Sequence, residues 1–508
     1  MIKSGHFGPG FTKPPPRRWD AGDSNLYLSV PEPMNTKSSL HLHLLGICGT
    51  GMAALAGILQ ELGHRVSGSD EQVYPPMSTF LEKLGITVQI GYRPENLNPA
   101  PDVVVVGNVI RRENPEAQAV LEKNLPRLSL PEALNHFLVA GRQSIVVAGT
   151  HGKTTTTALI AWLLHATGRD PGFMVGGIAK NFQSNYRVGT GPYVVLEGDE
   201  YDTAFFDKRP KFLHFQPHLA VLTSVEFDHA DIYADLDAVK RSFESFLAQT
   251  PPASSILACG DAPSVREVCR QATGNVEYYG LGEEVTWRAA KITPGNGGAR
   301  FTLVKDGTAW GEFFLPLLGV HNVLNATAAL AVLAKTGGGP AELQAALLGF
   351  QGVRRRLEKA CELQEVLILD DFAHHPTEVA ATLAAVRQGY PGRRLLAVFE
   401  PRTNTSRRKV FQKPYIAAFA EADLILVREP PDLWKVPEED RFSSWQLVQD
   451  LISGGKKAFY FPDTDHLFHS LCRGLRPRDV VAVMSNGHFD HLVTRLCQAL
   501  GASENPGL

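Results

Sequence analysis

The segment Gly149-Thr150-His151-Gly152-Lys153-Thr154 constrains this chain more than any other. The apolar run 145–147 before it predicts a buried strand, and the apolar run 158–164 after it predicts a helix. In such a turn, glycines let backbone N–H groups close around phosphate oxygens, and the helix N-terminus adds partial positive charge. The segment therefore predicts an ATP-binding phosphate loop, in which Lys153 reaches the β- and γ-phosphates and Thr154 binds Mg²⁺.

One position departs from the general phosphate-loop pattern. Val147 stands where that pattern has its first glycine, so the loop is the shorter Gly-x-x-Gly-Lys-Thr. The alternative is a glycine turn between a strand and a helix, with Lys153 solvated. The flanking strand and helix favour ATP.

Composition limits the classes of protein that the chain can belong to. Its 508 residues predict about two to four domains, because one core rarely grows so large. A net charge of −3 provides no basic field for nucleic acid, and no apolar run approaches the roughly 20 residues of a membrane span. The six cysteines are scattered without a C-x-x-C pair, which fits a reducing cytosol and argues against a disulfide frame or a cysteine zinc site.

The first domain is predicted over residues 39–138. Residues 1–38 are rich in Pro, Gly and Arg without an apolar core, and predict a flexible tail rather than a secretory signal. A strand from residue 41 leads through Gly46-Ile47-Cys48-Gly49-Thr50-Gly51-Met52 into a helix over 53–62, a turn suited to a diphosphate. The next strand ends at Asp70, where a dinucleotide fold places its ribose-binding acid, so this stretch alone suggests NAD. The alternative is a turn that holds no ligand.

A third strand, 103–106, ends at Gly107-Asn108. Repeated alternation of strands and helices predicts a parallel, doubly wound sheet with ligands at the carboxyl ends of its strands. Asn108 is therefore a candidate ligand contact.

The central domain is predicted over residues 139–352. Its strand 193–196 ends in the acidic run 197–202, of which Glu197 is nearest the strand and is the candidate Mg²⁺ ligand; the alternative is a solvated acidic turn. The strand 219–225 is followed by His229, a second candidate metal ligand or, alternatively, a structural histidine. Asn322 and Asn325 share a helix face, where they could bond a base edge or a phosphate; capping by Asn322 alone is the simpler alternative.

The third domain is predicted over residues 353–508. Strands at 366–369, 395–399, 424–427 and 480–484 end in polar clusters, which predicts another doubly wound sheet with a ligand crevice. It has no phosphate loop, so its ligand is not expected to be a second ATP. At its start, one guanidinium of Arg354-Arg355-Arg356 could reach a γ-phosphate; the alternative is a solvated linker.

In combination, these motifs resemble the Mur ligase family over about residues 40–495. The motifs are Gly149–Thr155, Glu197, His229, His321-Asn322-x-x-Asn325, Arg356 and Asp371-Phe-Ala-His-His-Pro. The resemblance implies an α/β protein of three domains: a Rossmann-like UDP-binding domain, a central P-loop ATPase domain and a C-terminal Rossmann-like domain. The shorter phosphate loop is normal in this family.

The resemblance also implies the roles of individual residues. ATP would contact Gly149, Thr150, His151, Gly152, Lys153, Thr154, Thr155, Asn322, Asn325, Arg356 and Asp371. Mg²⁺ would be held by Thr154, Glu197 and His229. A UDP-sugar would contact Gly49, Thr50, Gly51, Met52, Ser69, Asp70 and Asn108, and a peptide Arg402, Asn404, Ser485 and Asn486. Catalysis would rest on Lys153, Glu197, His229, Arg356 and His375, the last helping to accept a proton from the attacking amine.

Segments outside the phosphate loop indicate the substrates by resemblance. The turn at residues 46–52 is similar to that of members that bind UDP-N-acetylmuramate, so UDP replaces NAD as the expected nucleotide. Residues 72–79, 200–209, 226–231 and 484–487 resemble members that ligate the recycled tripeptide L-alanyl-γ-D-glutamyl-meso-diaminopimelate to that sugar through an acyl phosphate. Two departures are Gly198, where alanine is usual, and the segment His488–His491, where a glycine-rich turn is expected.

Two alternatives remain at this point. The first is a family member that adds L-alanine, from which the segment 200–209 differs. The second is a nucleotide-dependent switch protein, which the presence of Lys153, Glu197 and His229 disfavours. The expected protein is a cytoplasmic, ATP-dependent, amide-bond-forming ligase of murein recycling, a monomer or weak dimer, whose domains close on binding.

Overall fold

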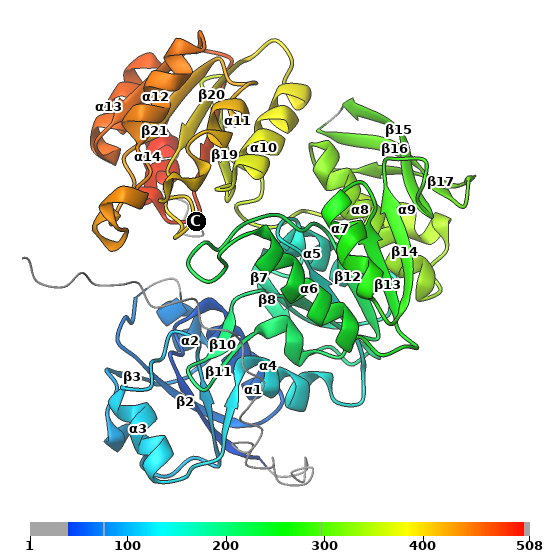
Figure 1. The fold of residues 1–508 in the computed structure, drawn as a ribbon, viewed down its shortest axis with the longest axis vertical. Helices are drawn as coiled ribbons and strands as arrows, with labels where there is room; N and C mark the ends of the chain where they lie inside the picture. Colours follow the sequence, from blue (N-terminus) through cyan, green and yellow to red (C-terminus); the bar gives the residue numbers. More distant parts are fainter. Residues whose placement is uncertain (1–38, 75–76, 296, 502–508) are drawn as a thin grey trace, which may run out of the picture. The chain divides into compact units, whose positions relative to one another are not determined.

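Short apolar strands alternating with helices build the described part of the chain, residues 39–74, 77–295 and 297–501 of the computed structural model (Figure 1). The tail predicted for residues 1–38 and the Pro75-Pro76 pair lie outside the described residues. The described residues form one five-stranded, one ten-stranded and one six-stranded sheet, together with a two-stranded hairpin.

The first sheet is wholly parallel, in the order β3-β2-β1-β4-β5. Its strands are β1 His41–Leu45, β2 Arg65–Asp70, β3 Val88–Ile90, β4 Val103–Val106 and β5 Arg127–Ser129, with helices α1 Thr50–Glu61, α2 Met77–Lys83, α3 Pro115–Glu122 and α4 Leu130–Leu134. The strand order reverses between β1 and β4, so the loops that follow these two strands flank a crevice. Sequence reasoning missed β3 and β5, because strands of three residues each are too short to show a pattern.

The second sheet has the order β17-β16-β15-β14-β13-β12-β6-β9-β7-β8, parallel from β15 to β7 and antiparallel at both ends. Its strands are β6 Gln143–Ala148, β7 Gly172–Ala179, β8 Ser184–Arg187, β9 Tyr193–Gly198, β12 Leu219–Leu222, β13 Ser255–Cys259, β14 Asn275–Gly280, β15 Trp287–Gly295, β16 Gly298–Lys305 and β17 Thr308–Leu315. The hairpin pairs β10 Asp202–Ala204 with β11 Asp207–Pro210.

Two alanine- and leucine-rich helices fill the core of this sheet. Helices α5 Lys153–Ala166 and α8 Val320–Lys335 pack against each other and bury nearly all of their apolar residues. The remaining helices here are α6 Leu236–Gln249, α7 Pro263–Val268 and α9 Pro340–Leu348. Helix α5 begins at Lys153, in the phosphate loop. The packing of α5 against α8 therefore fixes the position of Lys153 relative to the face of α8 that carries Asn322.

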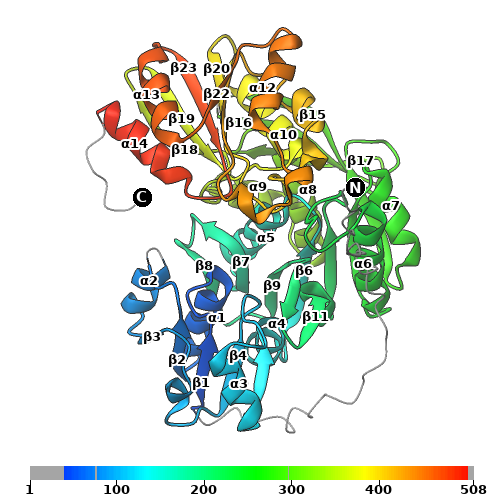
Figure 2. The ribbon, with the colours of Figure 1, turned by 60° about the vertical axis from the view of Figure 1, so that its left-hand side comes forward.

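The third sheet has the order β18-β19-β23-β20-β21-β22, with only β18 antiparallel among its described strands. Its strands are β18 Glu358–Leu363, β19 Val366–Asp371, β20 Arg394–Phe399, β21 Leu424–Arg428, β22 Ala458–Phe461 and β23 Asp479–Met484, and its helices are α10 Pro376–Gly389, α11 Pro414–Ala418, α12 Ser444–Ser453, α13 Thr464–Gly474 and α14 Leu492–Ala499. Alternate strand residues face two helical layers: α10, α11 and α12 on one side, α13 and α14 on the other (Figure 2).

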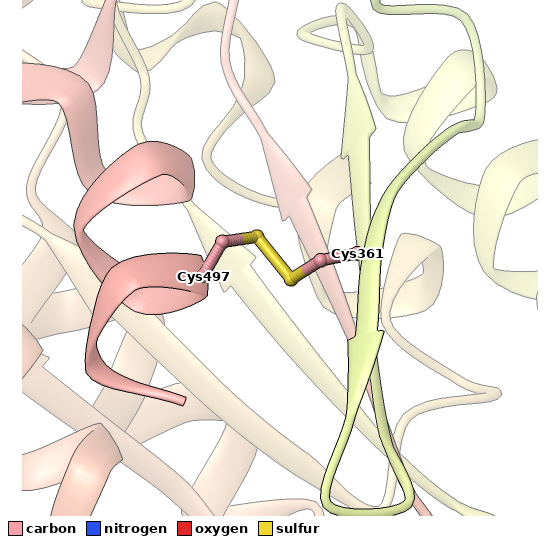
Figure 3. Close-up of a disulfide and its surroundings, with 2 residues drawn as sticks. All are labelled: Cys361 and Cys497. Carbon is pink, nitrogen blue, oxygen red and sulfur yellow. A yellow bond between two sulfur atoms is a disulfide. The ribbon is translucent and has the colours of Figure 1, made fainter. Parts of the chain in front are cut away.

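A disulfide joins Cys361 on β18 to Cys497 on α14 (Figure 3). The expectation that the cysteines form no disulfide frame is therefore wrong for this pair. The two residues are 136 positions apart, and they meet because the last helix packs back onto the edge strand. The spacing of the cysteines along the sequence does not predict a contact between residues so far apart. Cys48, Cys259, Cys269 and Cys472 are free.

The predicted class, α/β with parallel sheets, is confirmed by these three sheets. Of the predicted boundaries, residue 138 falls within the π-helical turn Asn135–Val139 ahead of β6, and residue 352 falls between α9 and β18. In the part of the chain that the structure describes, no helix has the length and apolar character needed to span a membrane.

Candidate active site

The phosphate loop follows β6, the strand that pairs with β9 on one side and β12 on the other. The carboxyl ends of these three parallel strands therefore bring the loop, the acidic run after β9 and the residues after β12 together. Gly149 has φ +135°, and a side chain there would overlap the Thr223 hydroxyl. Gly152 has φ +80°, and a Cβ atom there would lie 2.7 Å from Asn325 Oδ1. Both glycines are thus required by conformation and by space.

Lys153 lies at the centre of the site. Its Nζ donates to the carbonyl oxygen of Gly149 at 2.5 Å and lies 2.9–3.0 Å from both oxygens of Glu200. His229, in the left-handed conformation with φ +55°, places Nε2 2.9 Å from Glu200 Oε1. Glu200 is 2 % exposed, so it is a buried carboxylate shared by two basic groups.

The charges of this group depend on one another. Burial opposes the ammonium of Lys153, but Glu200 and Glu197 outweigh it and raise its pKa. Burial likewise opposes protonation of His229, but Glu200 and Asp228 raise the pKa of the imidazole. Both basic groups are therefore stabilised in their charged forms until an anionic ligand competes for them.

Thr154 and Glu197 form an oxygen-rich pair beside this group. The Thr154 hydroxyl donates to Glu197 Oε1 at 3.0 Å, and the N–H of Gly176 donates to Oε2 at 2.8 Å. Burial raises the pKa of Glu197, and Lys153 opposes that rise. The Thr154 hydroxyl at the start of α5 and the Glu197 carboxylate at the end of β9 can together hold a hard cation.

Another set of potential ligand atoms lies nearby. One nitrogen of His151, one of His375 and an oxygen of Glu226 lie within 4.8 Å of one another. Sequence reasoning did not group these three, because they come from the phosphate loop, the segment after β12 and the segment after β19.

Asn322 and Asn325 face the phosphate loop from α8. Asn325 Nδ2 donates to Asn322 Oδ1 at 3.2 Å, while Asn325 Oδ1 accepts from the Thr156 hydroxyl at 3.2 Å. The N-cap of α8 is Gly319, so Asn322 does not cap the helix as the alternative supposed. The two asparagines therefore connect α8 to α5, and their contact with the nucleotide stays a prediction. Thr155 lies two residues after Lys153 in α5, and it is buried, with 6 % of its surface exposed.

Arg356 reaches the phosphate loop from the segment that precedes β18. Its Nη2 lies 3.4 Å from the Thr154 hydroxyl, and its guanidinium lies 4.9 Å from the centre of the Phe372 ring. Asp371 uses both of its oxygens near this segment: Oδ2 accepts from the Leu357 N–H at 2.6 Å and Oδ1 from the Ala373 N–H at 2.9 Å. Asp371 thus holds the segment that carries Arg356, and its contact with ATP stays a prediction.

His375 is the N-cap of α10. Its Nδ1 accepts from the Thr377 N–H at 3.2 Å, and Nε2 lies 3.2 Å from the Phe227 carbonyl oxygen. Burial and the neighbouring His151 lower the pKa of His375 to about 4. The ring is therefore neutral, but both nitrogens are already bonded. These bonds do not support the predicted role as proton acceptor.

Glu378, whose side chain is 14 % exposed, joins the phosphate loop to α10. Its Oε1 lies 3.2 Å from His151 Nδ1, and its Oε2 lies 3.4 Å from His374 Nδ1. Although burial opposes it, Glu378 and Glu226 raise the pKa of His151 to about 10. The imidazole of the phosphate loop is therefore positively charged at neutral pH, as suits a loop that binds phosphate.

The glycine-rich turn at residues 46–52, between β1 and α1, lines a cavity of about 260 Å³ that also reaches Glu197. The predicted residues in its lining are Gly49, Thr50, Gly51, Met52 and Asn108. Asp70 instead orders the loop: its Oδ2 accepts from the Cys48 N–H at 2.9 Å and its Oδ1 from the Gln72 N–H at 3.1 Å. Ser69 is fully buried, and its hydroxyl has no hydrogen-bond partner. Ligand contacts of these residues stay predictions.

The four predicted peptide residues follow β20 and β23. Arg402 lies 3.3 Å from His488 Nε2, and Asn404 Nδ2 donates to Asp231 Oδ2 at 2.8 Å. Ser485 is buried and donates to Glu400 at 2.6 Å, whereas Asn486 Oδ1 is buried without a hydrogen-bond partner. The guanidinium of Arg402 also lies 3.7 Å from Glu400 Oε2 and keeps further N–H donors for a ligand. Asn486 Oδ1 is available, while Asn404 and Ser485 are already engaged.

Family models match three successive parts of the chain. Residues 41–142 match the Mur ligase family catalytic domain, residues 147–333 the Mur ligase middle domain, and residues 355–487 the Mur ligase glutamate ligase domain. The chain belongs to the Mur ligase family.

Two sequence relatives from different branches of the Mur ligases have similar identities. The chain is 38 % identical over 461 residues to the UDP-N-acetylmuramate–L-alanyl-γ-D-glutamyl-meso-2,6-diaminoheptandioate ligase of Haemophilus influenzae, covering 91 % of this chain and 99 % of that protein. It is 37 % identical over 448 residues to the UDP-N-acetylmuramate–L-alanine ligase of Oleidesulfovibrio alaskensis, covering 88 % and 96 %.

Among solved structures of Mur ligases, the crystal structure of a murein peptide ligase from Psychrobacter arcticus has a TM-score of 0.67 and 34 % identity. The similarity covers 92 % of this chain and all of that one. The protein is accordingly an ATP-dependent ligase of the Mur family.

Sequence reasoning about this Mur ligase missed several charged residues of the site. Glu200 stands in the same acidic run as the predicted ligand Glu197, and residue spacing alone does not indicate that its side chain is buried. Glu378 completes a capping box three residues after His375, a pattern that could have identified it. Lys211 lies two residues after the segment 200–209, and it belongs to no motif that would have identified it as a site residue.

Proposed function

We propose that the protein ligates the tripeptide L-alanyl-γ-D-glutamyl-meso-diaminopimelate to UDP-N-acetylmuramate, with ATP converted to ADP and phosphate. The observation that carries the proposal is the 38 % identity to the H. influenzae tripeptide ligase over nearly the whole of both chains. Adding L-alanine to the same sugar is the competing activity, and the relative at 37 % identity is the reason to test it.

The residues around Thr154 fit a magnesium ion. Mg²⁺ prefers oxygen ligands, and the Thr154 hydroxyl and the half-buried Glu197 carboxylate lie 3.0 Å apart beside the phosphate loop. When bound there, Mg²⁺ would neutralise the negative charge that gathers on the transferring phosphoryl group. His229 contacts Glu200 rather than an oxygen of this pair, so its predicted coordination of the metal is the weaker part of the set.

The first step is attack of the sugar's lactyl carboxylate on the γ-phosphorus of ATP. A carboxylate oxygen forms the new P–O bond, the bond to the β-phosphate oxygen breaks, and ADP leaves with an acyl phosphate formed. Lys153 and Arg356 stabilise this step because both bear positive charge at the phosphate loop. Glu200 holds Lys153 in place before ATP arrives.

The second step is attack of the tripeptide's free amine on the acyl carbon. The new C–N bond forms as the C–O bond to phosphate breaks, and the proton that the amine loses ends on the released phosphate as HPO4²⁻. The positive charges that supported the first step also stabilise the departing phosphate. Arg402 and Asn486 are the proposed contacts of the tripeptide. The guanidinium of Arg402 has more N–H donors than its contacts with His488 and Glu400 use, and Asn486 Oδ1 has no hydrogen-bond partner.

The proposal is tested by phosphate release from ATP with Mg²⁺ and UDP-N-acetylmuramate. Parallel reactions contain the tripeptide, L-alanine or no acceptor, and products are identified by mass. We expect release and a UDP-muramoyl tripeptide with the tripeptide only. Release with L-alanine only would assign the protein to the competing activity. The absence of release in every reaction would contradict both.

A further inference from the structure

The cavity beside the first-domain loop contains a charged group that the mechanism above does not use. This cavity of about 260 Å³ extends from Gly51, in the glycine-rich turn at residues 46–52, and Asn108 to Glu197 beside the phosphate loop. A UDP-sugar held at one end must therefore pass its sugar and acyl group through the cavity to reach the γ-phosphate at the other. The inference that follows rests on the proposed function.

The lining of this cavity is unfavourable to an anion except at one point. Its charged residues are Glu197, Asp199 and Lys211, so among the described lining residues Lys211 is the one basic side chain. An incoming carboxylate would be repelled by the two acids and attracted by the ammonium of Lys211. The side chain of Lys211 is 15 % exposed, so water screens this attraction only weakly.

Lys211 is held firmly enough to select a ligand. Its Nζ donates to Asp199 Oδ2 at 2.6 Å and lies 5.9 Å from the centre of the Tyr201 ring. Its backbone N–H donates to the Tyr201 carbonyl at 3.0 Å, at the base of the β10–β11 hairpin. An ammonium has three donors, so the bond to Asp199 leaves hydrogen-bonding capacity toward the cavity.

Asp199 is equally fixed. Its Oδ1 accepts from the Tyr201 N–H at 3.1 Å, and its carbonyl accepts from the Phe212 N–H at 3.1 Å. The Asp199 carboxylate is therefore fixed in place, and its 2.6 Å bond to Nζ keeps Lys211 oriented.

We propose that Lys211 binds the lactyl carboxylate of UDP-N-acetylmuramate and directs it toward the γ-phosphate, with Asp199 as the residue that positions Lys211. This makes Lys211 a residue that selects the donor by its carboxylate. A UDP-sugar without the lactyl group would lose this contact and keep those of its nucleotide and diphosphate.

The test compares two ligands that differ in that carboxylate. Calorimetry measures binding of UDP-N-acetylmuramate and of UDP-N-acetylglucosamine, which has the same nucleotide and amino sugar without the lactyl group. For Lys211→Met we expect UDP-N-acetylmuramate to bind about 10- to 100-fold more weakly, the range for loss of a charged hydrogen bond, with UDP-N-acetylglucosamine unchanged within about twofold. Lys211→Arg should restore most of the preference.

Lys208→Met is the matched control. Lys208 lies in the same hairpin, 56 % exposed and paired with Asp202 at 2.7 Å, and we expect it to leave both affinities unchanged. Because Lys211→Met leaves the carboxylate of Asp199 without its ion-pair partner, the double variant Lys211→Met/Asp199→Asn removes both charges. Its expected loss is also specific to UDP-N-acetylmuramate. Urea unfolding confirms that each variant is folded.

The outcomes separate this inference from the proposed function. Wild-type protein that binds neither UDP-sugar would contradict the proposed function. The wild-type protein could prefer UDP-N-acetylmuramate while the Lys211 variants bind both UDP-sugars more weakly by the same factor. That result would place Lys211 at the diphosphate and overturn the inference. Folded variants with undiminished preference for UDP-N-acetylmuramate would overturn it as well. In turnover, the inference predicts a raised KM for UDP-N-acetylmuramate and unchanged KM values for ATP and tripeptide.

Discussion

At the scale of single residues, Gly152 combines a backbone requirement with a spatial one. Gly152→Ala would force an alanine into the left-handed region at φ +80° and bring its Cβ to 2.7 Å from Asn325 Oδ1. We expect phosphate release to fall about 100-fold or more, because small displacements of a catalytic loop have effects of that size. The measurement is steady-state release with saturating tripeptide.

Gly168 provides the matched control at the other end of α5. Its φ is +75°, but nothing lies within 4 Å of a Cβ atom built there. Gly168→Ala should therefore share the conformational cost of about 1–2 kcal/mol in unfolding free energy and retain its activity. Equal activity losses in the two variants would show that backbone strain alone, rather than the contact with Asn325, explains the effect.

Glu200 was not among the predicted site residues, yet its carboxylate contacts both Lys153 and His229. Glu200→Gln would keep the side-chain volume and remove the charge shared by Lys153 and His229. We expect kcat to fall about 10- to 100-fold as Lys153 loses its orientation. Asp202→Asn, which alters the exposed ion pair with Lys208 in the same acidic run, should stay within about twofold. The account is contradicted if both variants lose activity equally.

At the scale of elements, the sequence predicted the parts of the fold that apolar runs and glycine turns mark. The strands that end at Ala148, Gly198 and Met484 are long, apolar and followed by polar clusters, so their positions followed from pattern. The positions of the strands β3 and β5 did not, because three residues are too few to show a periodic pattern. Side-chain partners such as Glu378 for His151 depend on contacts 227 residues apart, which one sequence cannot reveal.

The disulfide between β18 and α14 yields a prediction at this scale. Reduction, or the double variant Cys361→Ser/Cys497→Ser, should lower the unfolding free energy of the C-terminal region by about 2–4 kcal/mol. Urea unfolding with and without reductant measures the effect, and the double variant should not respond to reductant. If all six cysteines of the unfolded, unreduced protein react with iodoacetamide, the disulfide is absent in solution.

At the scale of the whole molecule, the site requires residues from separate parts of the chain. Arg356 contacts Thr154, and His374 lies 3.7 Å from Asp228, so groups after residue 353 approach those of the phosphate loop. We predict that these parts of the chain separate in solution when no ligand is bound, and that an ATP analogue together with UDP-N-acetylmuramate brings them together and makes the protein more compact. Small-angle scattering measures the change in the radius of gyration. Superimposable profiles with and without both ligands would contradict closure.

The central claim is that the phosphate loop activates the donor's carboxylate as an acyl phosphate. The most direct measurement uses UDP-N-acetylmuramate labelled with ¹⁸O in its lactyl carboxylate, together with ATP and the tripeptide. The account predicts that one labelled oxygen moves to inorganic phosphate in each turnover, because the carboxylate oxygen bonded to phosphorus leaves with it. Product formation with no ¹⁸O in the phosphate would contradict the account.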